Sequence, residues 1–487
     1  MPEPIIFECG SPGRRGYTLP VCDVPENPIE NYIPERLVRK NPPRLPEISE
    51  GEAVRHFVNL SILNYHIDKG FYPLGSCTMK YNPKVNEIAA RLDGFRRLHP
   101  LQEETQIQGA LKLHYELERY LCEIVGMDAV TLQPAAGSQG ELSGLLMIHK
   151  YHQMMGNVRG EILIPDSAHG TNPASVTMAG YKAVQVKSNQ QGRIDIGDLR
   201  QKLSPKVAGM MLTNPNTLGL FESDIGEIER LVHSVGALLY LDGANLNALL
   251  GIIRPGDVGF DVAHINLHKT FSTPHGGGGP GAGVVAVKKI LEPFLPVPRI
   301  KVRNERYSWD WDRPQSIGKI HTFFGNFGVL VRAFTYIRMY GRERLGDISK
   351  NAIINANYLM SRLREYLTVP YPGPCMHEVV FSGDVLRSLG LRTTDLAKRL
   401  LDYGLHAPTI YFPLIVHEAI MIEPTETESK ETLDRFVDTV IMVLKEAKEY
   451  PNLLLDAPQT TPVARLDDAY AAKTLDVRYP FESRVQS

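Results

Sequence analysis

The chain has 487 residues, of which 43% are hydrophobic and 22% are charged. This length exceeds the ~250 to 300 residues at which single hydrophobic cores stop growing, so two or three domains are expected, and the composition excludes a chain that is disordered throughout. Lysine and arginine together number 53, aspartate and glutamate number 55, and the net charge is −2. Because there is also no long basic run, nucleic-acid binding is not expected.

Neither a secretory signal nor a membrane span is expected. The stretch MPEPIIFECGSPGRRG places charges and glycines where a signal peptide needs a continuous apolar core. No stretch approaches ~18 uninterrupted apolar residues. The five cysteines are scattered without a CxxC spacing, which argues against a disulfide framework and a zinc knuckle. We therefore expect a soluble, cytoplasmic protein without a membrane partner.

The predicted elements begin with an irregular N-terminal arm, residues 1–85, which is rich in proline and carries one helix near 47–64. A large domain, residues 86–335, follows, in which helices alternate with short apolar runs. The runs are AVTL (129–132), EILI (161–164), KAVQV (182–186), VAGMMLT (207–213), ALLYL (237–241), HINL (264–267) and GAGVVAV (281–287). This alternation predicts βα units and a mostly parallel sheet that is covered on both faces.

The remaining sequence predicts a smaller α+β domain, residues 336–455. After a long helical stretch that starts near 323, we expect strands at 377–383 and 418–424 and helices at 393–404 and 429–450. The tail, residues 456–487, has little periodicity and is expected to pack as an extended strap. Polar residues cluster just after the strands of the large domain, where open α/β sheets bind their ligands.

The most unusual stretch is DVAHINLHKTFSTPHGGGGPGAGVV, residues 261–285, in which histidines and one lysine precede four glycines. A zinc site would use His264 and His268, four residues apart, with His275 as a third ligand. On a strand, however, that spacing separates two side chains too far for joint ligation. A phosphate-binding P-loop needs its lysine after the glycines, whereas Lys269 comes before them.

Lys269 can instead be a lysine that holds pyridoxal phosphate as a Schiff base. Such a lysine must be partly desolvated so that its amine can be neutral near pH 7, and the end of an apolar strand provides that environment. The cofactor also needs a carboxylate opposite its ring nitrogen, because the protonated ring is the electron sink of its chemistry. Asp242 follows the run 237–241 and fits this role, although helix N-capping explains an aspartate there equally well.

Other strand ends supply the remaining groups that this cofactor needs. The turn PAAGSQGELSG offers Gly137, Ser138 and Gln139 at a helix start, where backbone N–H groups bind phosphate. His169 can stack on the ring, and Asn214 can hydrogen-bond its phenolic oxygen, although the NPN sequence is also a good turn. Because these groups follow successive strands in order, the set predicts a pyridoxal phosphate site.

These segments resemble the P-protein family of the glycine cleavage system, glycine dehydrogenase (decarboxylating). The matching stretches are YPLGSCTMKYNP, QPAAGSQGE, PDSAHGTNPAS, TNPNTLGLFE, DGANLNA, INLHKTFSTPHGGGGPG, HAPTIYFP and MIEPTETES, between about residues 70 and 430. One departure is YFPLIVHEAIMIEP, where single-chain members usually have a small-residue stretch. Because single-chain members are longer, the chain is similar to subunit 2 of the two-chain members, the cofactor-bearing half.

The resemblance implies an α/β architecture of fold type I, the aspartate-aminotransferase-like fold of pyridoxal phosphate enzymes. It implies the cofactor as a covalent Schiff base on Lys269, with His169 and Asp242 as further catalytic residues. His268 is expected among the cofactor-binding residues, and His264 and His268 are second-line candidates for positioning. The implied oxidoreductase activity is decarboxylation of glycine, with transfer of the aminomethyl group to the lipoyl arm of the H-protein. The implied partner is the related subunit 1, in a heterotetramer with two copies of each chain.

Two other interpretations remain open from the sequence. Another fold type I enzyme, such as an aminotransferase or a protein similar to serine hydroxymethyltransferase, would share the lysine, the aspartate and the fold. A non-enzymatic scaffold subunit would have a degenerate cofactor pocket, which the presence of Lys269, Asp242 and His169 argues against. The glycines at 276–279 form either a flexible linker or backbone that passes close to the cofactor or to a neighbouring subunit.

Overall fold

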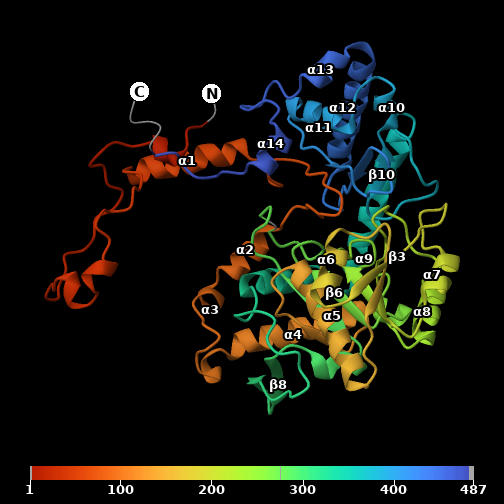
Figure 1. The fold of residues 1–487 in the computed structure, drawn as a ribbon, viewed down its shortest axis with the longest axis horizontal. Helices are drawn as coiled ribbons and strands as arrows, with labels where there is room; N and C mark the ends of the chain where they lie inside the picture. The colour runs from red at the N-terminus through yellow and green to blue at the C-terminus, as the bar shows by residue number, and fades with distance from the viewer. Residues whose placement is uncertain (1–2, 275, 482–487) are drawn as a thin grey trace. The chain divides into compact units, whose positions relative to one another are not determined.

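The computed structural model describes residues 3–274 and 276–481 (Figure 1). The described chain forms two compact units, one made of the segment up to Lys69 and the segment from Ala457, the other of Gly70–Asp456. The second unit contains all the residues of the expected site. The finer division into four segments, with boundaries near residues 85, 335 and 455, stays a prediction.

The first unit joins the two ends of the described chain. Its main element is α1 (Glu50–Leu63), which begins with a capping box because Ser49 accepts from the Glu52 N–H and the Glu52 carboxylate accepts from the Ser49 N–H. The rings of Phe7 and Tyr479 stack with their centroids 5.0 Å apart. The C-terminal tail is not extended throughout, because it forms the short helix α14 (Asp468–Lys473).

A seven-stranded sheet forms the centre of the second unit (Figure 1). The strands are β1 (Ala129–Thr131), β2 (Glu161–Pro165), β3 (Lys182–Val186), β4 (Val207–Thr213), β5 (Leu238–Gly243), β6 (Val262–Asn266) and β7 (Gly283–Val287). Their order is β1-β7-β6-β5-β4-β2-β3, and β7 runs antiparallel to both of its neighbours while the other pairs are parallel. Each strand overlaps one of the seven apolar runs, so the expected mostly parallel α/β sheet is confirmed.

The sheet is buried on both faces except at its edge strand β3, which is only partly buried. In β5, Leu239 and Leu241 belong to one apolar core, whereas Leu238 and Tyr240 belong to a second core on the other face. The first core includes residues of α4 (Gln108–Val125), α8 (Ile225–Ser234) and α9 (Phe327–Leu363), and the second includes residues of α5 (Gly137–Met154) and α6 (Thr171–Met178). Burial of both faces explains why these strands are continuous apolar runs rather than alternating ones.

A smaller α+β region follows α9 in the same unit, as expected. Its three-stranded antiparallel sheet has the order β10 (Val379–Ser382), β12 (Ala419–Ile422), β11 (Thr409–Ile410). A separate apolar core joins it to the end of α9 and to α11 (Thr393–Asp402), α12 (Lys430–Glu449) and α13 (Pro451–Leu455). Within α9, Gly341 has a non-helical φ of 65° and divides the helix in two.

The remaining elements are short. They are η1 (Ile6–Glu8), η2 (Ile29–Asn31), η3 (Glu35–Leu37), α2 (Lys84–Ala90), α3 (Asp93–Arg96), η4 (Glu104–Gln106), α7 (Ile196–Lys202), η5 (Pro255–Val258), η6 (Lys289–Phe294), α10 (Asp384–Arg387) and a hairpin of β8 (Arg299–Arg303) and β9 (Arg306–Asp310). The hairpin was not predicted from the sequence. Among the described helices, none is long and apolar enough to cross a membrane.

Candidate active site

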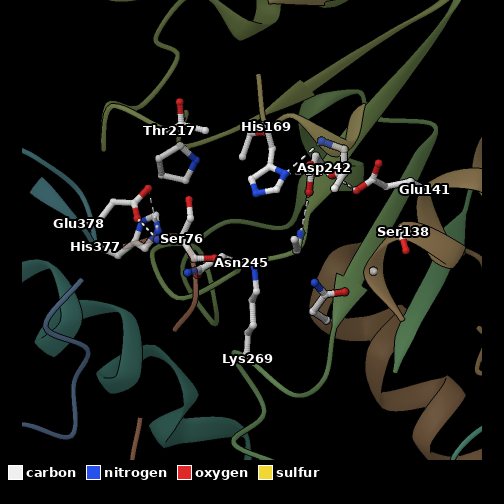
Figure 2. A pocket seen from close by; sticks show the side chains of 16 residues that line it. Ser76, Ser138, Glu141, His169, Thr217, Asp242, Asn245, Lys269, His377 and Glu378 are labelled. Carbon is white, nitrogen blue, oxygen red and sulfur yellow. Dashed lines mark hydrogen bonds and ion pairs between the residues drawn. The ribbon is translucent and has the colours of Figure 1, made fainter. Parts of the chain in front are cut away.

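A cavity of about 230 Å³ opens at the carboxyl ends of β4, β5 and β6 and at the start of α5 (Figure 2). Its lining residues are Ser76, Gly137, Ser138, Glu141, His169, Thr171, Thr213, Pro215, Thr217, Asp242, Ala244, Asn245, Asn266, Lys269, His377 and Glu378. The ends of parallel strands leave such a crevice because the chain turns away there into the covering helices. The segments that hold Ser76 and His377 come from outside the large sheet.

Lys269 lies three residues beyond the end of β6 and is only partly exposed. Its Nζ donates a hydrogen bond of 2.7 Å to the carbonyl oxygen of Ser76. The neighbouring Thr270 is fixed by Lys80, whose buried Nζ donates to the Thr270 carbonyl oxygen and to Glu426, both at 2.7 Å. This buried ion pair thus fixes the backbone beside Lys269 and explains one role of the YPLGSCTMKYNP stretch.

Asp242 lies near the end of β5 and is buried. The parallel pairing of β5 with β6 sets Asp242 beside His264, and one carboxylate oxygen lies 3.2 Å from His264 Nε2. The other oxygen accepts from Asn172 at 2.9 Å, and the Ala244 N–H donates to the first at 3.1 Å. Burial alone would raise the pKa of Asp242, but His264, these two donors and Lys269 together hold it below its ordinary value. Asp242 is therefore a carboxylate at neutral pH.

The turn before α5 is shaped for an anion. The N-cap residue, Ala136, has no side chain that can accept from the first helical N–H groups, so Gly137 and Ser138 present a helix N-terminus to the cavity. The turn also packs tightly against β7, because a Cβ on Gly283 would lie 2.1 Å from the Ala136 carbonyl oxygen. Phosphate at this turn would satisfy the free N–H groups.

Gly283→Ala is expected to lower stability by about 1 to 3 kcal/mol, because the added methyl group forces the turn away from β7. The same displacement should weaken the binding of pyridoxal phosphate. Thermal unfolding and a titration with the cofactor check the two effects. Gly226→Ala is the matched control, since a Cβ there meets no atom within 4 Å and the site is in α8; a similar loss in both variants would contradict the close-packing argument.

His169 also lines the cavity, from the loop before α6. Its Nδ1 lies 3.0 Å from the Thr171 hydroxyl, and the ring makes an edge contact with Phe412 at 5.6 Å between centroids. Phe412 belongs to the stretch YFPLIVHEAIMIEP, residues 411–424. The ring is exposed on the solvent side, so it is available to a planar ligand.

Three other sequence-predicted residues use their side chains elsewhere. Within the described chain, the lining of the cavity does not include Gln139, Asn214 or His268. The Gln139 amide accepts from the Ala135 N–H at 2.6 Å and donates to the Ile320 carbonyl at 2.8 Å. Asn214 Oδ1 accepts from the Glu222 N–H at 2.9 Å, and His268 Nδ1 accepts from the Ala282 N–H at 3.2 Å. These contacts shape the loops around the site.

The histidine pair suggested for zinc does not form a joint site. Of the two groups of possible metal ligands found among the described residues, one joins His264 to Glu141 and Asp242, and neither includes His268. His275, the suggested third ligand, lies outside the described residues. Glu141 is itself occupied as an acceptor from Thr171 at 2.7 Å and from Ser175 at 2.8 Å.

The cavity fits a polar, phosphate-bearing ring compound. Thr213 Oγ1 and Asn266 Oδ1 are buried atoms of lining residues that have no hydrogen-bond partner in the described chain. Unpaired buried polar atoms are rare in native proteins and indicate a missing ligand or water. Together with the helix start at Gly137, the Asp242 carboxylate and the Lys269 amine, they are of the kinds that would fit pyridoxal phosphate.

Comparison with known proteins identifies the family. The family model of the glycine cleavage system P-protein matches residues 23–302, which is more than half of the chain. The chain belongs to the P-protein family. A second model, the C-terminal domain of glycine dehydrogenase, matches residues 348–469.

Relatives of this P-protein match over almost their whole length. The probable glycine dehydrogenase (decarboxylating) subunit 2 of Chloroherpeton thalassium is 58% identical over 483 residues, or 98% of each chain. Among solved structures, a glycine decarboxylase (P-protein) of the glycine cleavage system in inhibitor-bound form has a TM-score of 0.71 at 20% identity, covering 85% of this chain and 94% of the other. The cysteine desulfurase CsdA of Escherichia coli has a TM-score of 0.58 at 16% identity, covering 78% and 95%. These neighbours confirm fold type I.

The glycine run of the P-protein chain acts through its backbone conformation. Gly276, Gly277 and Gly278 all have positive φ, at 64°, 58° and 119°, which other residues adopt only with strain. A Cβ on Gly277 or Gly278 would meet no described atom within 4 Å. The need for glycine at positions 277 and 278 is therefore explained by the positive φ of the turn and not by a described segment that packs against it.

Several lining residues were missed by sequence reasoning. Ser76 was assigned to an irregular arm, and His377 and Glu378 were included in a predicted strand without a role. Glu141 was missed although a signal for it existed. It lies four positions after Gly137, and residues four apart share one face of a helix. For Ser76, His377 and Glu378 no local signal exists, because only tertiary packing brings them to Lys269.

Proposed function

We propose that this P-protein chain catalyses the pyridoxal-phosphate-dependent decarboxylation of glycine and the transfer of the remaining aminomethyl group to the lipoyl arm of the H-protein. In the overall reaction, glycine loses carbon dioxide, one sulfur of the lipoyl disulfide receives the aminomethyl group, and the other becomes a thiol. The observation that carries the proposal is the meeting of Lys269, Asp242 and the helix start at Gly137 in one cavity of a chain of this family.

Different residues of the cavity would contact different parts of the cofactor. The N–H groups at Gly137 and Ser138 would hold the phosphate, Asp242 would hold a proton on the ring nitrogen, and His169 would lie against the ring. When bound, pyridoxal phosphate supplies the electron sink for the electrons left when glycine loses its carboxylate. Lys269 would bind the cofactor covalently, and its Nζ donates to the Ser76 carbonyl whenever the amine is free.

Borohydride reduction followed by peptide mapping tests the assignment of the lysine. Reduction of the purified holoenzyme is expected to fix a pyridoxyl group on Lys269. A pyridoxyl group on any other residue would contradict the proposed site. A preparation that binds no cofactor would favour the scaffold interpretation, and carbon dioxide release that needs no lipoylated H-protein would favour another fold type I enzyme.

The proposed partner in the assembly is subunit 1, because the relatives that match this chain end to end are named as subunit 2 of the enzyme. The proposed assembly is a heterotetramer with two copies of each chain. Measuring the mass of this chain alone and after mixing with subunit 1 tests it. An unchanged mass after mixing would contradict the assembly but not the chemistry of the cavity.

A further inference from the structure

His377 and Glu378 form a wall of the cavity that the cofactor contacts proposed above do not use. They immediately precede β10, and both side chains are buried. Figure 2 shows them on one side of Lys269, with Asp242 on the other. Their position beside the reactive lysine, rather than beside the phosphate turn, places them where an amino-acid substrate would extend from the ring.

His377 carries a buried nitrogen without a partner. The residue is 3% exposed, and its Nδ1 has no hydrogen-bond partner in the described chain. Its Nε2 lies 3.8 Å from a Glu378 oxygen, beyond hydrogen-bond distance. Burial, together with the positive charge of Lys269, lowers the pKa of His377 to about 3. The ring is therefore neutral at physiological pH and offers one N–H group without a cationic charge.

Glu378 is the second buried polar group of this wall. One of its oxygens accepts from the Ser76 N–H at 2.8 Å. Burial and the nearby Glu423 carboxyl raise the pKa of Glu378 well above its ordinary value. The raised pKa favours the protonated form of Glu378, in which the oxygen that does not accept from Ser76 can donate a hydrogen bond.

The cavity has few positive charges for a substrate carboxylate. Among the described residues that line it there is no arginine, and Lys269 is the only lysine. Lys269 is committed to the cofactor under the proposed function. A carboxylate that enters this cavity must therefore be held by groups other than a fixed cation.

We propose that His377 and Glu378 bind the carboxylate of the amino-acid substrate as hydrogen-bond donors. The proposal rests on the function proposed above and adds the substrate contacts that it lacks. Neutral donors orient a carboxylate without cancelling its charge. Because that charge leaves the carboxylate as the carbon–carbon bond breaks, such a subsite favours the transition state over bound glycine, which a tight cationic clamp would not.

A metal ion would be another use of these residues, since His377, Glu378 and Glu423 lie close enough to share one. The contacts of Glu423 argue against it. Its oxygens already accept from the Thr78 N–H, the Thr78 hydroxyl and the Asn245 amide, at 2.7 to 2.8 Å. The positive charge of Lys269 also reduces the pKa of His377 and would oppose a cation here.

Glycine and methylamine differ by the carboxylate, so comparing their binding tests whether His377 and Glu378 contact that group. Glycine and methylamine are titrated separately into holoenzyme assembled with its partner subunit, and the change in the visible absorption of the cofactor gives each Kd. His377→Ala is expected to raise the Kd of glycine about ten- to a hundred-fold, the effect of one hydrogen bond to a charged group, and to leave that of methylamine unchanged. His377→Leu repeats the test if the alanine variant does not fold.

Conservative variants and a matched control complete the experiment. His377→Asn, which keeps an N–H near the Nδ1 position, should restore most of the glycine affinity, and Glu378→Gln should retain it. His114→Asn, at another buried histidine with a pKa near 4, should change neither Kd. Equal weakening of both amines in His377→Ala would overturn the carboxylate role, as would glycine binding that requires added Mg²⁺ or Mn²⁺. A holoenzyme that responds to neither amine would instead overturn the proposed function.

Discussion

Lys269→Ala is expected to abolish the covalent attachment of pyridoxal phosphate and to reduce glycine-dependent exchange of carbon dioxide to background. Among the described residues that line the cavity, Lys269 carries the only primary amine, so no neighbour can replace it. The visible absorption band of the bound cofactor and the exchange of labelled bicarbonate into glycine measure the two losses. Residual cofactor bound without a covalent bond is expected, because the turn at Gly137 and Ser138 is untouched.

Lys269→Arg and Lys288→Ala are the control variants for this prediction. Lys269→Arg keeps a cation near Glu378 and Glu423, whose buried carboxyl groups it faces, yet cannot form the covalent bond. It should therefore lose activity as fully as Lys269→Ala. Lys288→Ala removes a partly buried amine that donates to the Gly126 carbonyl outside the cavity and should leave the absorption band intact. Exchange activity that survives in Lys269→Ala would refute the assignment.

Most of the central sheet was predictable because its inner strands face apolar cores on both sides. A short continuous apolar run such as VAGMMLT, bounded by turn residues, is typical of a strand covered on both faces, and this pattern located β4. The hairpin of β8 and β9 was missed because its two strands, RIKVR and RYSWD, are charged and only partly buried. Both residues of the turn between them, Asn304 and Glu305, adopt positive φ, but only the asparagine is a residue that favours this conformation.

The candidate site could be predicted only where its residues follow strands of the sheet. Lys269, Asp242 and His169 meet because the carboxyl ends of parallel strands share one edge. Ser76 is 193 positions before Lys269 and 302 before Glu378, and no periodicity connects such distant segments. Asn214 was predicted to bind the cofactor through its side chain, but the Glu222 N–H already donates to Asn214 Oδ1, a competition that the sequence does not reveal.

Asp242→Asn is expected to slow the reaction strongly, because the pairing of β5 with β6 holds the Asp242 carboxylate in the cavity. The variant is expected to retain pyridoxal phosphate and to lose on the order of 10²- to 10³-fold in the rate of glycine-dependent carbon dioxide exchange, because the amide cannot stabilise a protonated ring nitrogen. The shape of the site should survive. The Asn172 amide, whose Oδ1 has no partner in the described chain, can turn to accept a hydrogen bond from the amide that the substitution introduces.

Asp261→Asn is the matched control for this loss. Asp261 is also a buried carboxylate paired with a histidine, His233, but it lies at the opposite end of the same two strands. Its hydrogen bond is the largest cause that raises the pKa of His233 to about 9. The pair therefore stabilises the fold below pH ~6.5, the unfolded pKa, and loses that contribution as the pH rises through 9. Asp261→Asn should lower stability at neutral pH and leave the rate of carbon dioxide exchange normal. A near-normal rate of carbon dioxide exchange in Asp242→Asn, by contrast, would contradict the role of Asp242 as the partner of the ring nitrogen.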